Sequence, residues 1–176
     1  MSQQEGTVTR RVVLLRHAKS AWPAGVPDHD RPLAGKGRRN AKAAGDWLRR
    51  EGPPIDLVLC SDALRARHTW EIAGAVLTEL PALHLVPALY GAEPREVVDL
   101  LRSCADQFGT VLLVGHEPTM SATTALLAGP GSDQGALGRV RLKFPTSAIS
   151  VLRTESAWAD LAAGQAVLET FAVPRA

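Results

Sequence analysis

Runs of consecutive apolar residues predict three buried strands in this chain. They lie in RVVLLR at residues 11–16, IDLVLCSD at 55–62 and GTVLLVGHE at 109–117. Strands that are apolar on both faces are typical of parallel sheets, because helices cover both faces of such sheets. A fourth, shorter strand is expected within 83–89, where Pro87 favours a position at the sheet edge.

Helical spacing of apolar residues alternates with these strands. Helices are expected within residues 35–52, 63–80, 93–107 and 118–129. Residues 18–35 contain three prolines and the polar run DHDRP, so they are expected to form a long loop. This order predicts an α/β fold, a three-layer α/β/α sandwich around a mostly parallel central sheet.

The C-terminal part has a different pattern. GRVRLKF at 138–144, SAISVLR at 147–153 and AVLETFAV at 166–173 all read as strands, without long helices between them. They are expected to complete the sheet as antiparallel strands. Residues 1–9 are expected to be a flexible tail and residues 10–176 a single domain.

Charged and polar side chains follow the predicted strands where each strand ends. Arg16 and His17 end the first strand, Arg65 lies one helical turn after the end of the second, and His116 ends another. In open α/β sheets the carboxyl ends of parallel strands lie at one edge, where ligands bind. The two histidines and two arginines are therefore expected to form one site.

This set of residues suits phosphoryl transfer. Arginines bind phosphate oxygens in pairs, and a neutral imidazole can attack phosphorus without a separate base. We therefore expect His17 to be the nucleophile, with Arg16, Arg65 and His116 binding the phosphoryl group and Ser20 donating to it from the loop. A single histidine at a strand end is more often structural, but four matching residues favour a site. No metal or other cofactor is required.

Four motifs resemble the histidine phosphatase superfamily. LLRHAKSAW resembles its strand ending in Arg-His-Gly, with Ala18 in place of the glycine, and CSDALRARHT resembles its second motif, with Arg65 as the phosphate arginine. LLVGHEPT resembles the motif that carries the second histidine, and DRPLAGKG resembles a further family element. Within the family, the short chain and the RHAKS start are most similar to the SixA-type phosphohistidine phosphatase branch.

The resemblance implies a metal-independent phosphatase with a covalent phosphohistidine intermediate on His17. The residue that protonates the leaving group stays open among four candidates, which are Glu93, Glu117, Asp28 and Asp30. An imidazole leaving group needs less acid assistance than an alkoxide, which favours protein phosphohistidine as substrate. The alternatives are a small-molecule phosphomonoester phosphatase, a mutase-like phosphoryl transfer and a non-catalytic phosphate-binding module.

Composition excludes several other classes of protein. The 176 residues are 45% hydrophobic and 22% charged, with a formal net charge of only +2, so neither disorder nor a nucleic-acid partner is indicated. The expected partner is instead a phosphorylated protein or a small phosphorylated metabolite. No apolar window is long enough to span a membrane, and two isolated cysteines fit a reducing compartment, so a cytoplasmic location is expected.

Overall fold

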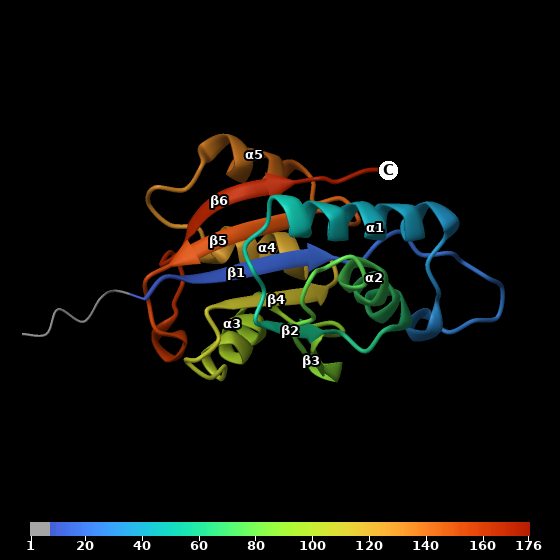
Figure 1. Cartoon of the computed structure of the whole chain (residues 1–176), viewed down its shortest axis with the longest axis horizontal. Coiled ribbons are helices and arrows are strands. Elements are labelled where there is room, and N and C mark those ends of the chain that lie inside the picture. The colour runs from blue at the N-terminus through green and yellow to red at the C-terminus, as the bar shows by residue number, and fades with distance from the viewer. Residues whose placement is uncertain (1–7) are drawn as a thin grey trace, which may run out of the picture.

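A six-stranded sheet forms the centre of the computed structural model, which describes residues 8–176 (Figure 1). Most of the predicted N-terminal tail, residues 1–7, lies outside the described residues. The strands follow the order β3-β2-β4-β1-β5-β6 across the sheet. They are β1 (Arg10–Arg16), β2 (Leu57–Cys60), β3 (Ala82–Leu85), β4 (Thr110–Gly115), β5 (Ile149–Thr154) and β6 (Val167–Ala172).

The strand directions agree with the prediction of a mixed sheet. β1, β2, β3 and β4 run parallel, whereas β5 is antiparallel to β1 and β6 is antiparallel to β5. β4 lies between β1 and β2, which places the carboxyl ends of these three strands side by side. β3 lies at the edge with all four residues exposed, as the proline after it indicated.

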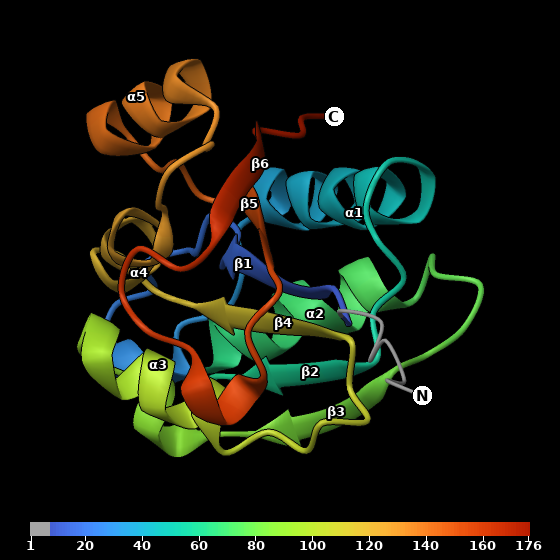
Figure 2. The ribbon, with the colours of Figure 1, turned by 90° about the vertical axis from the view of Figure 1, so that its left-hand side faces the viewer.

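Helices cover both faces of the sheet, as Figure 2 shows. α1 and α2 lie on one face, and α3, α4 and α5 lie on the other. Among residues 8–176, no helix has the length and apolarity needed to cross a membrane. The helices are α1 (Gly35–Arg50), α2 (Leu64–Gly74), α3 (Pro94–Arg102), α4 (Thr119–Leu127) and α5 (Gln134–Leu142).

Alternate residues of each central strand enter two separate cores. In β1, Val12 and Leu14 face the core under α3 and α4, whereas Val13 and Leu15 face the core under α1 and α2. Successive side chains of a strand point to opposite faces, so covering both faces requires an uninterrupted apolar run. The predicted three-layer architecture is confirmed, and the apolar runs are its cause.

One predicted strand is wrong. Residues 138–144 were expected to be extended, but most of them lie in helix α5. Ala136, Leu137 and Val140 provide the buried face at helical spacing, and the Asp133 carboxylate caps the helix by accepting from the Ala136 N–H at 2.8 Å. The alternation of Val140 and Leu142 suggested a strand, yet Leu142 is exposed, so the tertiary contacts favour the helix.

The long loop after β1 is held against the first turn of α1. The Lys19 carbonyl accepts a hydrogen bond from the Ala34 N–H at 2.9 Å, and an isolated bridge joins Ser20 to Leu33. A Cβ atom on Gly37 would lie 2.0 Å from the Lys19 carbonyl oxygen, so only glycine permits this approach. The backbone that follows His17 is therefore fixed by α1.

We expect Gly37→Ala to lower the free energy of unfolding by about 1–3 kcal/mol, because the new methyl group must displace the Lys19 backbone. Gly138→Ala is the matched control, since a Cβ atom there meets no atom within 4 Å among the described residues. That control should raise stability by about 0.5–1 kcal/mol, as alanine favours the helix. Urea unfolding measures the free energy of unfolding of both variants. Equal changes in the two variants would show that the Lys19 contact does not constrain the loop.

Candidate active site

His17 and His116 lie next to each other at the ends of adjacent strands. The β1–β4 register pairs Arg16 with Gly115, and the His17 N–H donates to the Gly115 carbonyl at 2.9 Å. The centroids of the two imidazole rings are 5.2 Å apart and their planes are inclined by 55°. The register of β1 and β4 therefore brings the two imidazoles together at one edge of the sheet. Both side chains are buried.

The His17 ring is held through its Nδ1 atom, which lies 2.7 Å from the Ala18 carbonyl oxygen. A carbonyl only accepts, so Nδ1 carries the proton and the Nε2 lone pair is left available. Burial is the main cause that lowers the pKa of His17 to about 3. The positive charges of His116, Arg65 and Arg16 also lower this pKa, whereas the hydrogen bond to the Ala18 carbonyl raises it. At neutral pH the ring is uncharged.

His116 is held through the opposite nitrogen. Its Nε2 atom lies 2.8 Å from Ser61 Oγ, and Ser61 Oγ itself accepts from the Ala63 N–H at 3.3 Å. The Ser61 hydroxyl can therefore donate to Nε2, which leaves the proton of the neutral ring on Nδ1. Burial, and then the charge of Arg65, lowers the pKa of His116 to about 4. Nδ1 is buried without a hydrogen-bond partner among residues 8–176.

Arg16 and Arg65 place two permanent cations beside the imidazoles. Arg16 Nη1 donates to the Phe144 carbonyl at 2.8 Å, which directs the guanidinium from the end of β1. The Nε atoms of both arginines are buried, and neither has a hydrogen-bond partner in the described part of the chain. Buried donors without acceptors are costly, so this edge of the sheet is suited to an anion that supplies acceptor oxygens.

Asp28 fixes Arg65 from the loop after β1. Arg65 donates to the Asp28 carbonyl at 2.7 Å through Nη1 and to the Asp28 carboxylate at 3.1 Å through Nη2. The carboxylate also accepts from Tyr90 Oη at 2.5 Å and from Arg31 Nε at 3.0 Å. The hydrogen bond from Tyr90 is the main cause that lowers the pKa of Asp28 to about 2, and Arg31 and Arg65 lower it as well. Asp28 is therefore a carboxylate at neutral pH.

The other candidate acids lie in different surroundings. Glu93 is the N-cap of α3, where it forms a capping box with Glu96, and Asp30 is exposed and lies 3.4 Å from His29. Glu117 lines the cavity in front of the histidines and accepts hydrogen bonds from the N–H and hydroxyl of Ser121, both at 2.7 Å. Of the four carboxylates proposed from the sequence, the lining of this cavity includes Glu117 alone.

The cavity in front of the histidines has a volume of about 260 Å³. It brings together all five predicted site residues, including Ser20, whose hydroxyl accepts a hydrogen bond from Arg31. Trp22, 78% exposed, stands at its border with the Arg31 guanidinium 3.5 Å from the ring centroid. Its lining consists of Arg16, His17, Lys19, Ser20, Trp22, Arg31, Arg65, His116, Glu117 and Thr146.

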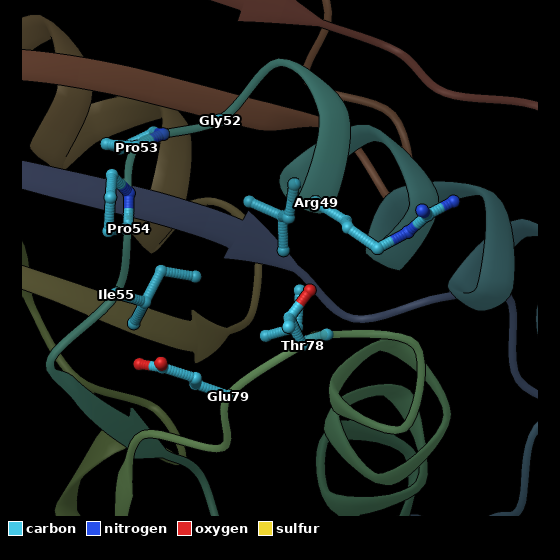
Figure 3. Close-up of a pocket in the computed structure, with 9 residues that line it drawn as sticks. Arg49, Gly52, Pro53, Pro54, Ile55, Thr78 and Glu79 are labelled. Carbon is cyan, nitrogen blue, oxygen red and sulfur yellow. The ribbon is translucent and has the colours of Figure 1, made fainter.

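A separate cavity of about 280 Å³ lies between the end of α1, the segment leading into β2 and the turn that follows α2 (Figure 3). Its lining includes Arg49 and Glu79 but, among the described residues, no histidine. Because it adjoins the amino end of β2, it lies away from the carboxyl ends that carry His17 and His116. Within residues 8–176, no three His, Cys, Asp or Glu side chains cluster as a metal site would require.

Sequence reasoning gave no role to two serines of the site. Ser61 orients His116, and Ser147 donates its N–H to the carbonyls of Arg16 at 3.1 Å and His17 at 3.3 Å. Ser147 reaches this position with a φ of 64°, in the left-handed region that is rare for serine. Ala18 has no such positive φ, so ordinary backbone dihedrals accommodate alanine where the related motif has glycine.

Comparisons with known proteins show which family the chain resembles. The model of the histidine phosphatase superfamily (branch 1) matches residues 12–89. An uncharacterised protein of Mycobacterium tuberculosis is 48% identical over 162 residues, which cover 92% of this chain and 100% of the relative. Phosphohistidine phosphatase SixA of Escherichia coli is 28% identical over 142 residues, which cover 80% of this chain and 83% of that protein.

Two solved structures share the fold over almost the whole chain. A candidate phosphohistidine phosphatase SixA from Nakamurella multipartitia has a TM-score of 0.84 and 37% identity, and the match covers 96% of this chain and 98% of that one. The protein histidine phosphatase SixA complexed with tungstate has a TM-score of 0.75 and 25% identity, covering 93% and 97%. These likenesses support phosphatase activity. The chain belongs to the histidine phosphatase superfamily, in its SixA-type branch.

Proposed function

We propose that this protein hydrolyses protein phosphohistidine without a metal ion, through a covalent phosphohistidine intermediate on His17. The observation that carries the proposal is the meeting of His17, His116, Arg16 and Arg65 at one cavity. Tungstate is a tetrahedral oxyanion like phosphate, so the tungstate complex of the related SixA protein supports a phosphoryl site in this fold.

In the first step, the Nε2 lone pair of His17 attacks phosphorus and forms a new P–N bond. The P–N bond of the substrate breaks, and its electron pair leaves with the substrate imidazole, whose other ring nitrogen carries a proton, as a neutral ring. The phosphorylated His17 ring retains its Nδ1 proton and gains positive charge. The Ala18 carbonyl, 2.7 Å from Nδ1, stabilises that charge.

In the second step, water attacks the phosphorus on His17 and the P–N bond breaks. The electron pair returns to Nε2, inorganic phosphate leaves, and the proton lost by the water passes to phosphate or solvent. In both steps the Nδ1–H of His116 and the guanidinium groups of Arg16 and Arg65 donate to the phosphoryl oxygens. Such fixed donors stabilise the transition state because no reorganisation is needed as charge develops.

Three features support phosphohistidine as the substrate. The Asp28 carboxylate is ionised and tied to Arg65, so it is not a proton donor at neutral pH. An imidazole leaving group reduces the need for such a donor. Trp22 lines the cavity and is exposed, and Tyr90, 41% exposed, lies with its ring 5.5 Å from that of His116. Both suit contact with another protein, since both residue types are enriched in interfaces.

A small phosphomonoester is the second candidate substrate, favoured by Glu117. This carboxyl group lines the cavity beside His116 and could protonate an alkoxide leaving group. The experiment below compares the two donors directly.

We expect His17→Ala to lose at least about a thousandfold in turnover and all covalent label, because the nucleophile is removed. His84→Ala, an exposed histidine on edge strand β3, is the matched control and should retain both. The measurement is labelling that is quenched in alkaline detergent, with ³²P-phosphohistidine protein and, in parallel, a ³²P-labelled aryl phosphate, in the presence of EDTA. Base-stable, acid-labile label on the wild type identifies phosphohistidine, and the faster donor identifies the substrate class.

Two results would contradict this proposal. Label that persists in His17→Ala would place the covalent group on another residue. Absence of both label and phosphate release with either donor would leave a phosphate-binding module as the better interpretation. His17→Asn, compared by thermal unfolding, separates loss of the nucleophile from loss of folding.

We expect the rings of His17 and His116 to remain neutral from pH 8 down to pH 5. Their lowered pKa values, about 3 and about 4, mean that each ring takes up a proton only at more acidic pH. His29 provides an internal contrast, because its hydrogen bond to Asp62 raises its pKa above the ordinary value. Ring ¹⁵N NMR measures the pKa values of all three histidines. A titration midpoint of His17 near pH 6.5 would contradict the proposed neutral nucleophile.

We expect Ser61→Ala to lower kcat roughly tenfold, because His116 would no longer be restricted to the tautomer that donates from Nδ1. The same ¹⁵N NMR experiment should show the His116 proton distributed over both nitrogens. A reduced kcat with an unchanged tautomer would indicate that Ser61 acts through packing instead.

A further inference from the structure

A second cavity adjoins the catalytic one. It has a volume of about 290 Å³ and shares Arg16, Lys19 and Thr146 with the catalytic cavity as a common wall. The rest of its lining comes from α1, from the loop between α5 and β5 and from the chain after β6, which contribute Lys36 and Asn40, Lys143 and Pro145, and Arg175. A group bound here can therefore belong to the molecule whose phosphoryl group faces His17.

The lining of this second cavity is strongly basic. Arg16, Lys19, Lys36, Lys143 and Arg175 all contribute to it, and within residues 8–176 no carboxylate does. None of these five cations forms an ion pair with a carboxylate of the described chain. Uncompensated like charges repel one another, so an anion bound among them would be stabilised by all five.

The backbone holds this basic cavity in shape. The backbone of Lys19 is held by the hydrogen bond that its carbonyl accepts from the Ala34 N–H and by the close approach of Gly37. Lys36 lies in the first turn of α1, where the helix dipole adds positive potential. The Ser147 N–H, in the loop before β5, donates to the carbonyls of Arg16 and His17, which ties this loop to the backbone of His17.

We propose that this cavity is a second anion subsite, which binds a phosphate or carboxylate group of the same substrate whose phosphoryl group is removed at His17. The inference rests on the proposed phosphatase function. Two sources of such a group share this chemistry: an acidic side chain close to the phosphohistidine of a protein, and a second phosphate on a small metabolite.

The test compares substrates that differ only in the second anion. One pair is a phosphohistidine peptide with aspartates beside the phosphohistidine and the same peptide with asparagines. The other pair is an alkane bisphosphate and the matching alkyl monophosphate. We expect kcat/KM of the wild type to favour the doubly anionic member of at least one pair about tenfold or more, and the pair identifies the source.

The variants assign that preference to the cavity. In Lys36→Gln combined with Lys143→Gln, the ratio of kcat/KM within the preferred pair should fall about tenfold. Lys42→Gln is the matched control, because it removes the same charge from α1 at a lysine that instead pairs with Asp46 at 2.9 Å, and it should keep the ratio. Hydrolysis of both members of each pair by the wild type without any preference, or a ratio that the double variant retains, would overturn the proposal.

A binding measurement separates this inference from the proposed function. By calorimetry, a propane diphosphonate, which is not hydrolysed, should bind the wild type more tightly than propyl phosphonate, and the double variant should reduce that difference about tenfold. If neither substrate pair is hydrolysed but this difference is present, the anion subsite stands and the phosphatase proposal fails. Equal binding of the two phosphonates by the wild type overturns the subsite itself.

Discussion

The hydrogen bond from the His17 N–H to the Gly115 carbonyl, 2.9 Å long, sets the geometry on which the whole site depends. It continues the parallel register of β1 and β4 by one residue beyond the strands, so that His17 and His116 occupy matching positions. A slip of one residue would turn every side chain of β1 to the opposite face and would separate His17 from His116. The side chains of Val12 and Leu14 pack in one core and those of Val13 and Leu15 in the other, so the packing of both cores also positions His17.

The site combines this rigid frame with groups that the protein itself does not satisfy. The Nε atoms of Arg16 and Arg65 and the Nδ1 atom of His116 are buried without partners in the described structure. Each reduces stability, since a buried donor without an acceptor loses its hydration. The uninterrupted apolar core stabilises the sheet enough to hold these donors in place. Their fixed directions are what a phosphoryl group requires for binding and for transition-state stabilisation.

The loops around this frame carry side chains that line or border the two cavities. Residues 17–34 bring Asp28 to Arg65 and Trp22 to the border of the cavity in front of the histidines, while the loop before β5 brings Lys143 to the basic cavity. Loops on a rigid scaffold can change without disturbing the chemistry at the strand ends. Proteins with this same sheet can therefore act on different phosphorylated molecules.

The sequence by itself determined the alternating β/α order and the strands that are apolar on both faces. It also determined that Arg16, His17, Arg65 and His116 lie at one edge of the sheet. Those features depend on local periodicity and on the rule that parallel strands end together. It did not determine helix α5, because the apolar residues of so short a segment fit the spacing of a strand as well as that of a helix. Only the tertiary structure decided the contacts of Asp28 with Tyr90, of Ser61 with His116 and of Ser147 with the backbone of Arg16 and His17. Each joins residues distant along the chain, and such pairs have no periodic signature in a sequence.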